Sequence, residues 1–330
     1  MKGVRWFREY LAMLCIWAAL MLLFGALSEH FLTARTLGTL ANRIPALTVV
    51  AVGMTFVLII GGIDLSVGSL LALAGAVLGV ALVDWHWPLW LAMVAGLAVG
   101  GLAGTANGLI SVRLGIPAFI VTLGMLEIAR GLAFLVTDSR SKYIGGSVEA
   151  ISRPIAGVGV SPAFIIALLI VVAGQVVLSR TVFGRHLVAI GTNEAAVRLA
   201  GINPRLPKIA VFSLTGLLTG LGAIFYTSRL GSSDPNAGVG LELSAIAAVV
   251  IGGTSLMGGR GSVVTSFLGV LIIATLEAGL AQVGATEPAK RVITGSVIIV
   301  AVVLDAWRHR LSEGGLSWLR RMFHRPSPAP

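Results

Sequence analysis

Charged residues and cysteine are scarce in this sequence, and each scarcity excludes a class of protein. Only 12% of the 330 residues are charged, whereas 56% are hydrophobic and the mean hydropathy is +0.96. An ordinary soluble domain is about 25% charged, so a soluble chain of this length would have too little charge to cover its surface. The composition excludes an intrinsically disordered chain, disfavours a soluble enzyme and predicts a polytopic helical membrane protein.

Sequence motifs for catalysis, metal binding and nucleotide binding are also missing. Cys15 is the only cysteine, so neither a disulfide framework nor a cysteine metal cluster can form, and the five histidines never pair at ligand spacing. None of the four lysines follows a glycine, which excludes a phosphate-binding Gly-Lys-Ser/Thr loop. We therefore predict no catalytic residue, metal or cofactor in this chain, and ATP, if it is used, must bind another subunit.

The charge that is present is mostly basic, with a formal net charge of +10. The basic residues lie between or beside apolar spans, where they orient a membrane chain and contact anionic lipid headgroups. No basic face with interleaved aromatic residues is present, so a nucleic-acid partner is disfavoured. Residues 307–330 contain a basic amphipathic pattern typical of a helix that lies on a membrane surface.

Ten apolar spans follow one another along the chain. The first is longer than the apolar part of a signal peptide, so we interpret it as an uncleaved transmembrane helix. The third and the eighth are short, and both adjoin glycine clusters. The spans are about 11–28, 44–61, 68–83, 88–109, 116–136, 162–178, 209–227, 244–251, 263–281 and 292–306.

The distribution of basic residues orients these spans. With both termini in the cytoplasm, the inside segments contain 15 of the 24 Lys and Arg residues and the outside segments contain 8. Basic residues favour the cytoplasmic side. We therefore predict an all-α fold in which residues 1–330 form a single transmembrane domain with about ten segments, glycine-rich helix breaks and both termini cytoplasmic. Residues 1–10 and 307–330 would be cytoplasmic or interfacial tails, and 179–208 would be a cytoplasmic loop.

Two glycine-rich segments resemble each other. Residues 60–65 followed by Gly68-Ser69 share the order Ile-Gly-Gly-x-x-Leu, then Gly-Ser, with residues 251–256 followed by Gly261-Ser262. Interrupted helices in corresponding places are typical of a transport path, although 42 glycines also allow coincidence. The candidate path residues are Gly61, Gly62, Asp64, Ser66, Gly252, Gly253, Thr254 and Ser255.

Asp64 has two interpretations at this stage. A carboxylate in a glycine-rich break can accept hydrogen bonds from the free amides at the start of the next helix. It can also line the transport path directly, because ionisable groups inside a membrane face a cavity or a partner.

Glycines at four-residue intervals mark one face of the fourth span. They let another helix backbone approach closely, so we predict tight helix packing rather than ligand contact. The same spacing occurs once at Gly216 and Gly220. The column on the fourth span consists of Gly96, Gly100, Gly104 and Gly108.

Three more ionisable residues lie in apolar spans. Glu127 and Arg130 are three residues apart on a predicted helix, which is the spacing of an intramembrane ion pair. Glu277 has no partner nearby in the sequence, and an unpaired intramembrane carboxylate is typical of proton-coupled transporters.

Residues 191–202 form the most distinctive loop sequence. Asn193 can cap the start of a short helix, Glu194 suits its positive end, and Gly201 can end it. A short arginine-rich helix on the cytoplasmic face suits docking into a groove on a partner, whereas the alternative is an ordinary connecting loop. The predicted docking residues are Asn193, Glu194, Ala195, Ala196, Arg198 and Gly201.

Four ordered motifs together resemble the ribose/xylose/galactose-type sugar permease family of bacterial ABC importers. The stretch from Glu194 to Gly201 resembles the cytoplasmic EAA-type loop of these permeases. Ala200 departs mildly from the serine that is common in the family. The matching stretches are 61–69, 117–124, 191–202 and 250–261.

The resemblance implies a permease in the bacterial inner membrane that forms the path for a monosaccharide. It also implies a cytoplasmic ABC ATPase that uses ATP and magnesium, a periplasmic sugar-binding protein and a second permease copy as partners. The alternatives are a related permease for nucleosides or branched-chain amino acids, and an ion-coupled secondary transporter that uses Glu277.

Overall fold

The computed structural model describes residues 2–157, 159–286, 288–297, 299–300 and 302–303. The predicted tail at 307–330 and the end of the tenth span lie outside the described residues. The elements are α1 (Lys2–Leu27), α2 (Ala34–Arg43), α3 (Pro45–Ile59), α4 (Val67–Val83), α5 (Leu89–Leu114), α6 (Ala118–Val136), β1 (Lys142–Tyr143), η1 (Gly145–Ser147), α7 (Glu149–Ser152), α8 (Pro162–Arg180), α9 (Val182–Leu199), α10 (Arg205–Leu230), β2 (Ser232–Ser233), α11 (Leu241–Ile251) and α12 (Val263–Gln282). Residues 288–297 are also helical.

Local sequence signals set several helix ends. The Ser161 side chain accepts a hydrogen bond from the Phe164 amide at the start of α8, and Ser262 caps α12 in the same way. Gly115 and Gly231 follow the ends of α5 and α10 with left-handed backbones, which glycine adopts without strain.

Six helices in the described chain are long and apolar enough to cross a membrane: α1, α5, α6, α8, α10 and α12. The pair α2 and α3, bent by 45°, would make a seventh span if it is counted as one. The shorter apolar helices α4 and α11 correspond to the third and eighth predicted spans. The prediction of an all-α polytopic membrane protein is therefore confirmed.

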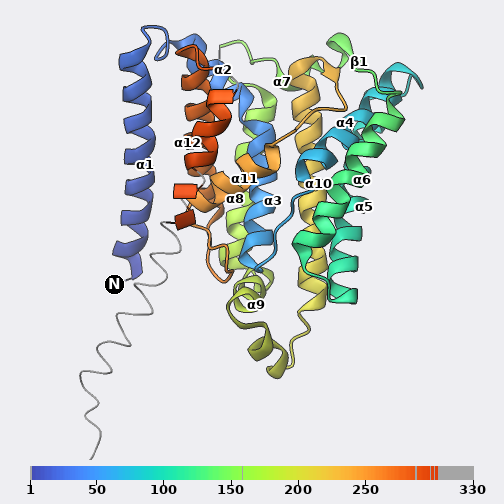
Figure 1. Cartoon of the computed structure of the whole chain (residues 1–330), viewed down its shortest axis with the longest axis vertical. Helices are drawn as coiled ribbons and strands as arrows, with labels where there is room; N and C mark the ends of the chain where they lie inside the picture. The colour runs from blue at the N-terminus through green and yellow to red at the C-terminus, as the bar shows by residue number, and fades with distance from the viewer. Residues whose placement is uncertain (1, 158, 287, 298, 301, 304–330) are drawn as a thin grey trace, which may run out of the picture.

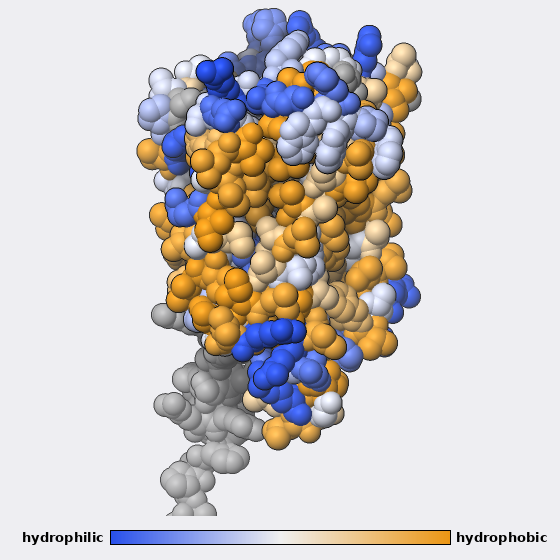
Figure 2. Space-filling model, turned by 90° about the vertical axis from the view of Figure 1, so that its right-hand side faces the viewer, coloured by the Kyte–Doolittle hydropathy of each residue, from blue (hydrophilic) through white to orange (hydrophobic). Residues whose placement is uncertain are grey.

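The helices form an elongated bundle with distinct ends (Figure 1). α2, α7 and β1 lie at one end, whereas α9 and the start of α1 lie toward the other. β1 and β2 pair antiparallel, with Lys142 opposite Ser233. A broad apolar band covers the face in Figure 2 between polar surfaces at its two ends, as a bilayer requires.

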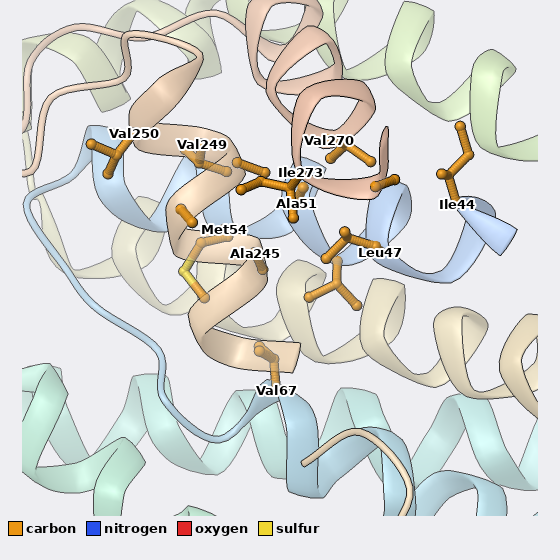
Figure 3. Close-up of a cluster of buried hydrophobic side chains, with 14 of the residues drawn as sticks. Ile44, Leu47, Ala51, Met54, Val67, Ala245, Val249, Val250, Val270 and Ile273 are labelled. Atoms are coloured by element: carbon orange, nitrogen blue, oxygen red, sulfur yellow. The ribbon is translucent and has the colours of Figure 1, made fainter. Parts of the chain in front are cut away.

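The core surrounds α3, whose residues are all buried. Leu47 and Met54 of α3 meet Val249 of α11 and Ile273 of α12 in one apolar cluster, which also includes Val67 at the start of α4 (Figure 3). Because side chains of α3, α4, α11 and α12 share this cluster, the short helices are held inside the bundle by apolar packing.

Candidate functional site

The segment between α3 and α4 is a true helix break. It leaves α3 through Gly61, whose φ of +74° places it in the left-handed region. Asp64 is fully buried, and its Oδ1 accepts hydrogen bonds from the Ser66 amide at 2.9 Å and the Ser66 hydroxyl at 2.6 Å. The carboxylate therefore binds the backbone of the residue that precedes α4, which is close to the capping interpretation of Asp64.

Two side chains that sequence reasoning missed complete this network. The Asn107 amide on α5 donates to Ser66 Oγ at 3.0 Å. The Thr122 hydroxyl on α6 donates to the Ile63 carbonyl and accepts from the Leu65 amide, each at 3.1 Å. The signal for both was a polar residue inside an otherwise apolar span, because such a side chain needs a partner when it is buried.

α11 begins beside the start of α4. A Cβ atom built on Gly68 of α4 would overlap the Glu242 carboxylate and the Gly238 carbonyl. Gly238 and Gly240, both with left-handed backbones, lead the chain into α11. The N-terminal ends of two short helices, reached from opposite ends of the bundle, therefore meet in its interior.

The two glycine-rich segments that resemble each other in sequence each join one apolar helix to the next. Residues 60–66 precede the short helix α4, whereas 252–262 follow the short helix α11 and lead into the long helix α12. The segment 231–240 leads into the short helix α11, as residues 60–66 lead into α4.

The 252–262 segment is nevertheless closely packed. A Cβ on Gly252 would lie 2.6 Å from the Thr265 carbonyl oxygen. Gly253 has a left-handed backbone, and Thr254 and Ser255 are buried. The Ser255 amide donates to the Arg260 carbonyl at 3.0 Å, which closes the segment into a compact turn.

α9 contains the predicted docking residues except Gly201, and it is longer than expected. The segment 179–208 was predicted as a loop with a short helix, but helix extends from Val182 to Leu199 with a break at Asn193 (φ −161°, ψ 93°). The predicted cap is confirmed, since Asn193 Oδ1 accepts from the Ala196 amide at 3.0 Å. Gly201 follows with a left-handed backbone, which ends the helix as predicted.

Glu194 joins the short helix after this break to α10. Its carboxylate pairs with Arg198 at 2.6 Å and with Lys208 of α10 at 2.5 Å, whereas Ala195 and Ala196 are exposed. Burial opposes ionisation of this carboxyl, but the hydrogen bonds from Lys208 and Arg198 outweigh it and lower its pKa. Glu194 is therefore a fixed negative charge that orients the helix.

A cavity of about 360 Å³ separates this helix from the first break. Gly61 and Gly62 line one side, and Glu194 and Arg198 line another. The loop between α5 and α6 closes it through residues such as Pro117. The predicted docking helix and the predicted break thus border one space at the α9 end of the bundle.

The glycine column of α5 faces α10. A Cβ on Gly100 would lie 3.0 Å from the Gly220 nitrogen, and one on Gly104 would lie 2.9 Å from the Gly216 Cα. Gly108 packs on the start of α10 and Gly96 on α4. The glycine column of α5 is therefore in direct backbone contact with Gly216 and Gly220 of α10.

The predicted Glu127–Arg130 pair is not formed as a direct contact in the described structure. Arg130 Nη1 donates instead to the carbonyl oxygens of Pro235 and Ala237, at 2.5 and 2.9 Å. Carbonyl groups freed by the irregular 234–240 segment need donors, and the guanidinium supplies them. Glu127 is exposed midway along α6 and acts on Arg130 only at longer range.

Glu277, for which the sequence offered no partner, is paired. Its carboxylate binds Arg43 at the end of α2 at 3.1 Å and accepts from Ser244 of α11 at 3.4 Å. Glu277 therefore links three helices near the end of the bundle opposite α9.

In the part of the chain that the structure describes, no group of three or more His, Cys, Asp or Glu residues is placed to hold a metal ion. Asp64, Thr122 and Arg130 instead bind backbone groups next to helix ends. The arrangement places two short helices inside the bundle and a polar surface at its α9 end.

Comparison with known proteins identifies the family. A family model described as "Branched-chain amino acid transport system / permease component" matches residues 36–302. The ribose import permease protein RbsC of Escherichia coli K12 is 38% identical over 91% of this chain and 94% of its own length. The D-allose transport system permease protein AlsC of the same strain is 35% identical over 88% and 89%. The autoinducer 2 import system permease protein LsrC of Enterobacter sp. 638 is 37% identical over 87% and 84%.

No solved structure matches the chain significantly. The family model covers most of the sequence, and the relatives are alike over nearly their full lengths. The chain therefore belongs to the ABC permease family that includes these sugar import permeases.

Proposed function

We propose that this chain is the permease subunit of an ATP-driven importer and forms the path for a monosaccharide across the bacterial inner membrane. The observation that carries the proposal is the meeting of α4 and α11 inside an apolar bundle, beside polar side chains that bind the freed backbone. Short interrupted helices of this kind give a transport path two arrangements without exposing backbone to lipid. The ribose and allose permeases among its relatives support a sugar as the substrate.

The topology follows from the same elements. The ten apolar spans form about ten membrane segments with both termini in the cytoplasm. The position of α9 at the same end as the start of α1, together with its excess of arginine, supports this orientation (Figure 1).

The surface at the α9 end of the bundle suits the docking of a partner protein. A separate cytoplasmic ATPase docks on the short helix from Asn193 to Gly201 and uses ATP and magnesium there, while the permease itself needs no cofactor. A periplasmic sugar-binding protein delivers the substrate to the opposite end, and a second permease copy completes the path. The polar capping of the docking helix by Asn193 and the ion pairs of Glu194 support a fixed docking surface.

Two alternatives differ in substrate and energy source. The names of the family model and of the autoinducer 2 relative favour other small solutes as a second substrate class. An ion-coupled mechanism is disfavoured, because Glu277 pairs with Arg43 and is not the unpaired intramembrane carboxylate that such a mechanism uses.

The substrate class is tested in proteoliposomes that contain the chain, its ATPase and its binding protein. We expect ATP-dependent uptake of a monosaccharide such as ribose or allose and no uptake of leucine. Uptake of leucine without uptake of any monosaccharide would overturn the sugar assignment but not the importer assignment.

A further inference from the structure

α9 contacts the core through the buried side chains of Leu187 and Ile190 and, at its break, through the backbone of Gly191. A Cβ built on Gly191 would overlap the Ile59 carbonyl oxygen and would lie 2.5 Å from the Gly259 nitrogen. The same Ile59 carbonyl accepts a hydrogen bond from the Gly259 amide at 2.8 Å. One carbonyl group at the end of α3 therefore joins the backbones of α3, α9 and the 252–262 segment.

Neighbouring residues extend this contact. A Cβ on Gly258 would lie 2.9 Å from the Gly191 carbonyl oxygen and 3.0 Å from the Gly61 nitrogen. A Cβ on Gly259 would lie 2.5 Å from Thr192 Oγ1. Gly61, Gly258 and Gly259 all have left-handed backbones, so other residues would be strained there even without the crowding. We name Ile59, Gly61, Gly191, Gly258 and Gly259 the glycine junction.

The junction lies next to the docking helix in the chain. Gly191 and Thr192 directly precede the break at Asn193, and the helix containing Glu194 starts immediately after it. On the other side, Ile59 leads through residues 60–66 to α4, and the 252–262 segment connects α11 with α12. Only a few residues of chain therefore separate the docking helix from the glycine junction, and the segments that meet at the junction lead directly to α4 and α11.

Contacts between backbones transmit displacement with little loss. A side chain between two elements can change rotamer and absorb a movement of an ångström or more, whereas packed backbone atoms cannot yield without moving their elements. This explains why three segments that are far apart in the sequence all place glycine at one point.

We propose that the glycine junction is the positioning contact through which α9 moves both α4 and α11 when the ATPase closes. This inference rests on the proposed function. Gly191 acts through these helices and does not touch the sugar. A methyl group at Gly191 would separate α9 from α3 and from the 252–262 segment while leaving the docking helix intact.

The test measures sugar imported and ATP hydrolysed in the same proteoliposomes, with the full chain, its ATPase and its binding protein. For Gly191→Ala we expect the sugar imported per ATP to fall about tenfold, within the range typical of coupling between sites, while the ATPase still co-purifies and hydrolyses ATP. Gly38→Ala on α2 is the matched control, because the nearest atom to a Cβ there is 3.8 Å away.

A second variant keeps the test decisive if Gly191→Ala fails to fold. One alanine inserted between Thr192 and Asn193 leaves the junction and the docking helix intact but alters their connection, and we expect the same loss of coupling. A folded Gly191→Ala, or the insertion, that imports sugar with the wild-type ratio overturns the proposal. If the wild-type complex itself shows no ATP-dependent import, the proposed function fails, and the inference fails with it.

Discussion

The contact between α5 and α10 allows a quantitative prediction, because glycines of both helices meet there. In Gly104→Ala the new Cβ would overlap the Phe212 carbonyl oxygen and would lie 2.9 Å from the Gly216 Cα. Carbon atoms pack best at about 3.5–4.0 Å, so the two backbones must separate by at least about 0.6 Å. Gly131→Ala on α6 is the control, because no atom lies within 4 Å of a Cβ at that helical position.

The two variants share one energetic term and differ in the other. Alanine is favoured over glycine within a helix by about 0.5–1 kcal/mol, and both variants gain this term. Only Gly104→Ala also overpacks a buried contact, which costs about 1–3 kcal/mol. The difference between the variants therefore isolates the packing cost at the α5–α10 contact.

This difference is measured by thermal unfolding of the detergent-solubilised protein, with size-exclusion chromatography used to detect the folded fraction at each temperature. At about 2–4 °C per kcal/mol, the Tm of Gly104→Ala should lie roughly 2–12 °C below that of Gly131→Ala. Equal Tm values for the two variants would refute the close backbone contact.

Three further predictions concern the charged groups. Glu194→Gln should lower uptake several-fold with unchanged expression. Because the pKa of Glu194 is lowered, its carboxylate and its ion pairs are fully present above the ordinary carboxyl pKa and are lost only as pH falls through the lowered value. The coupling of the wild-type complex should therefore stay constant between about pH 6 and 8. A steep change in the ratio of uptake to hydrolysis within that range would contradict this. Glu277→Gln should cost about 0.2–1 kcal/mol of stability through the partly exposed Arg43 pair, measured as a small fall in Tm; abolished uptake at unchanged Tm would instead favour ion coupling. Asp64→Ala removes the acceptor for the buried Ser66 amide and hydroxyl, and it should lower Tm and uptake together because an unsatisfied buried group costs about 1–3 kcal/mol. Asp64→Asn keeps an acceptor and should lower uptake more than expression. Wild-type uptake by Asp64→Asn would contradict a role of Asp64 in transport.

Features that depend on local spacing were predictable from the sequence. The four-residue glycine spacing of α5, the cap at Asn193 and the helix end at Gly201 each require only a few neighbouring residues. Apolar runs likewise located the helices, because their length and composition are set by the bilayer.

Features that depend on contacts between distant segments were not predictable. Arg130 has Glu127 three residues away, yet its guanidinium binds carbonyl groups of the 234–240 segment, whose irregular backbone has the greater need for donors. The pairing of Glu277 with Arg43 spans 234 residues.

Measuring which energy source drives transport shows whether this chain works as part of an ATP-driven importer. In proteoliposomes that contain the chain, its ATPase and its binding protein, we measure uptake of a labelled monosaccharide with ATP and magnesium on the cytoplasmic side, and separately with a proton or sodium gradient alone. We expect uptake with ATP that disappears when the ATPase is omitted, and no uptake with the gradient. Gradient-driven uptake by the chain alone, without ATP, would contradict the assignment as an ATP-driven importer.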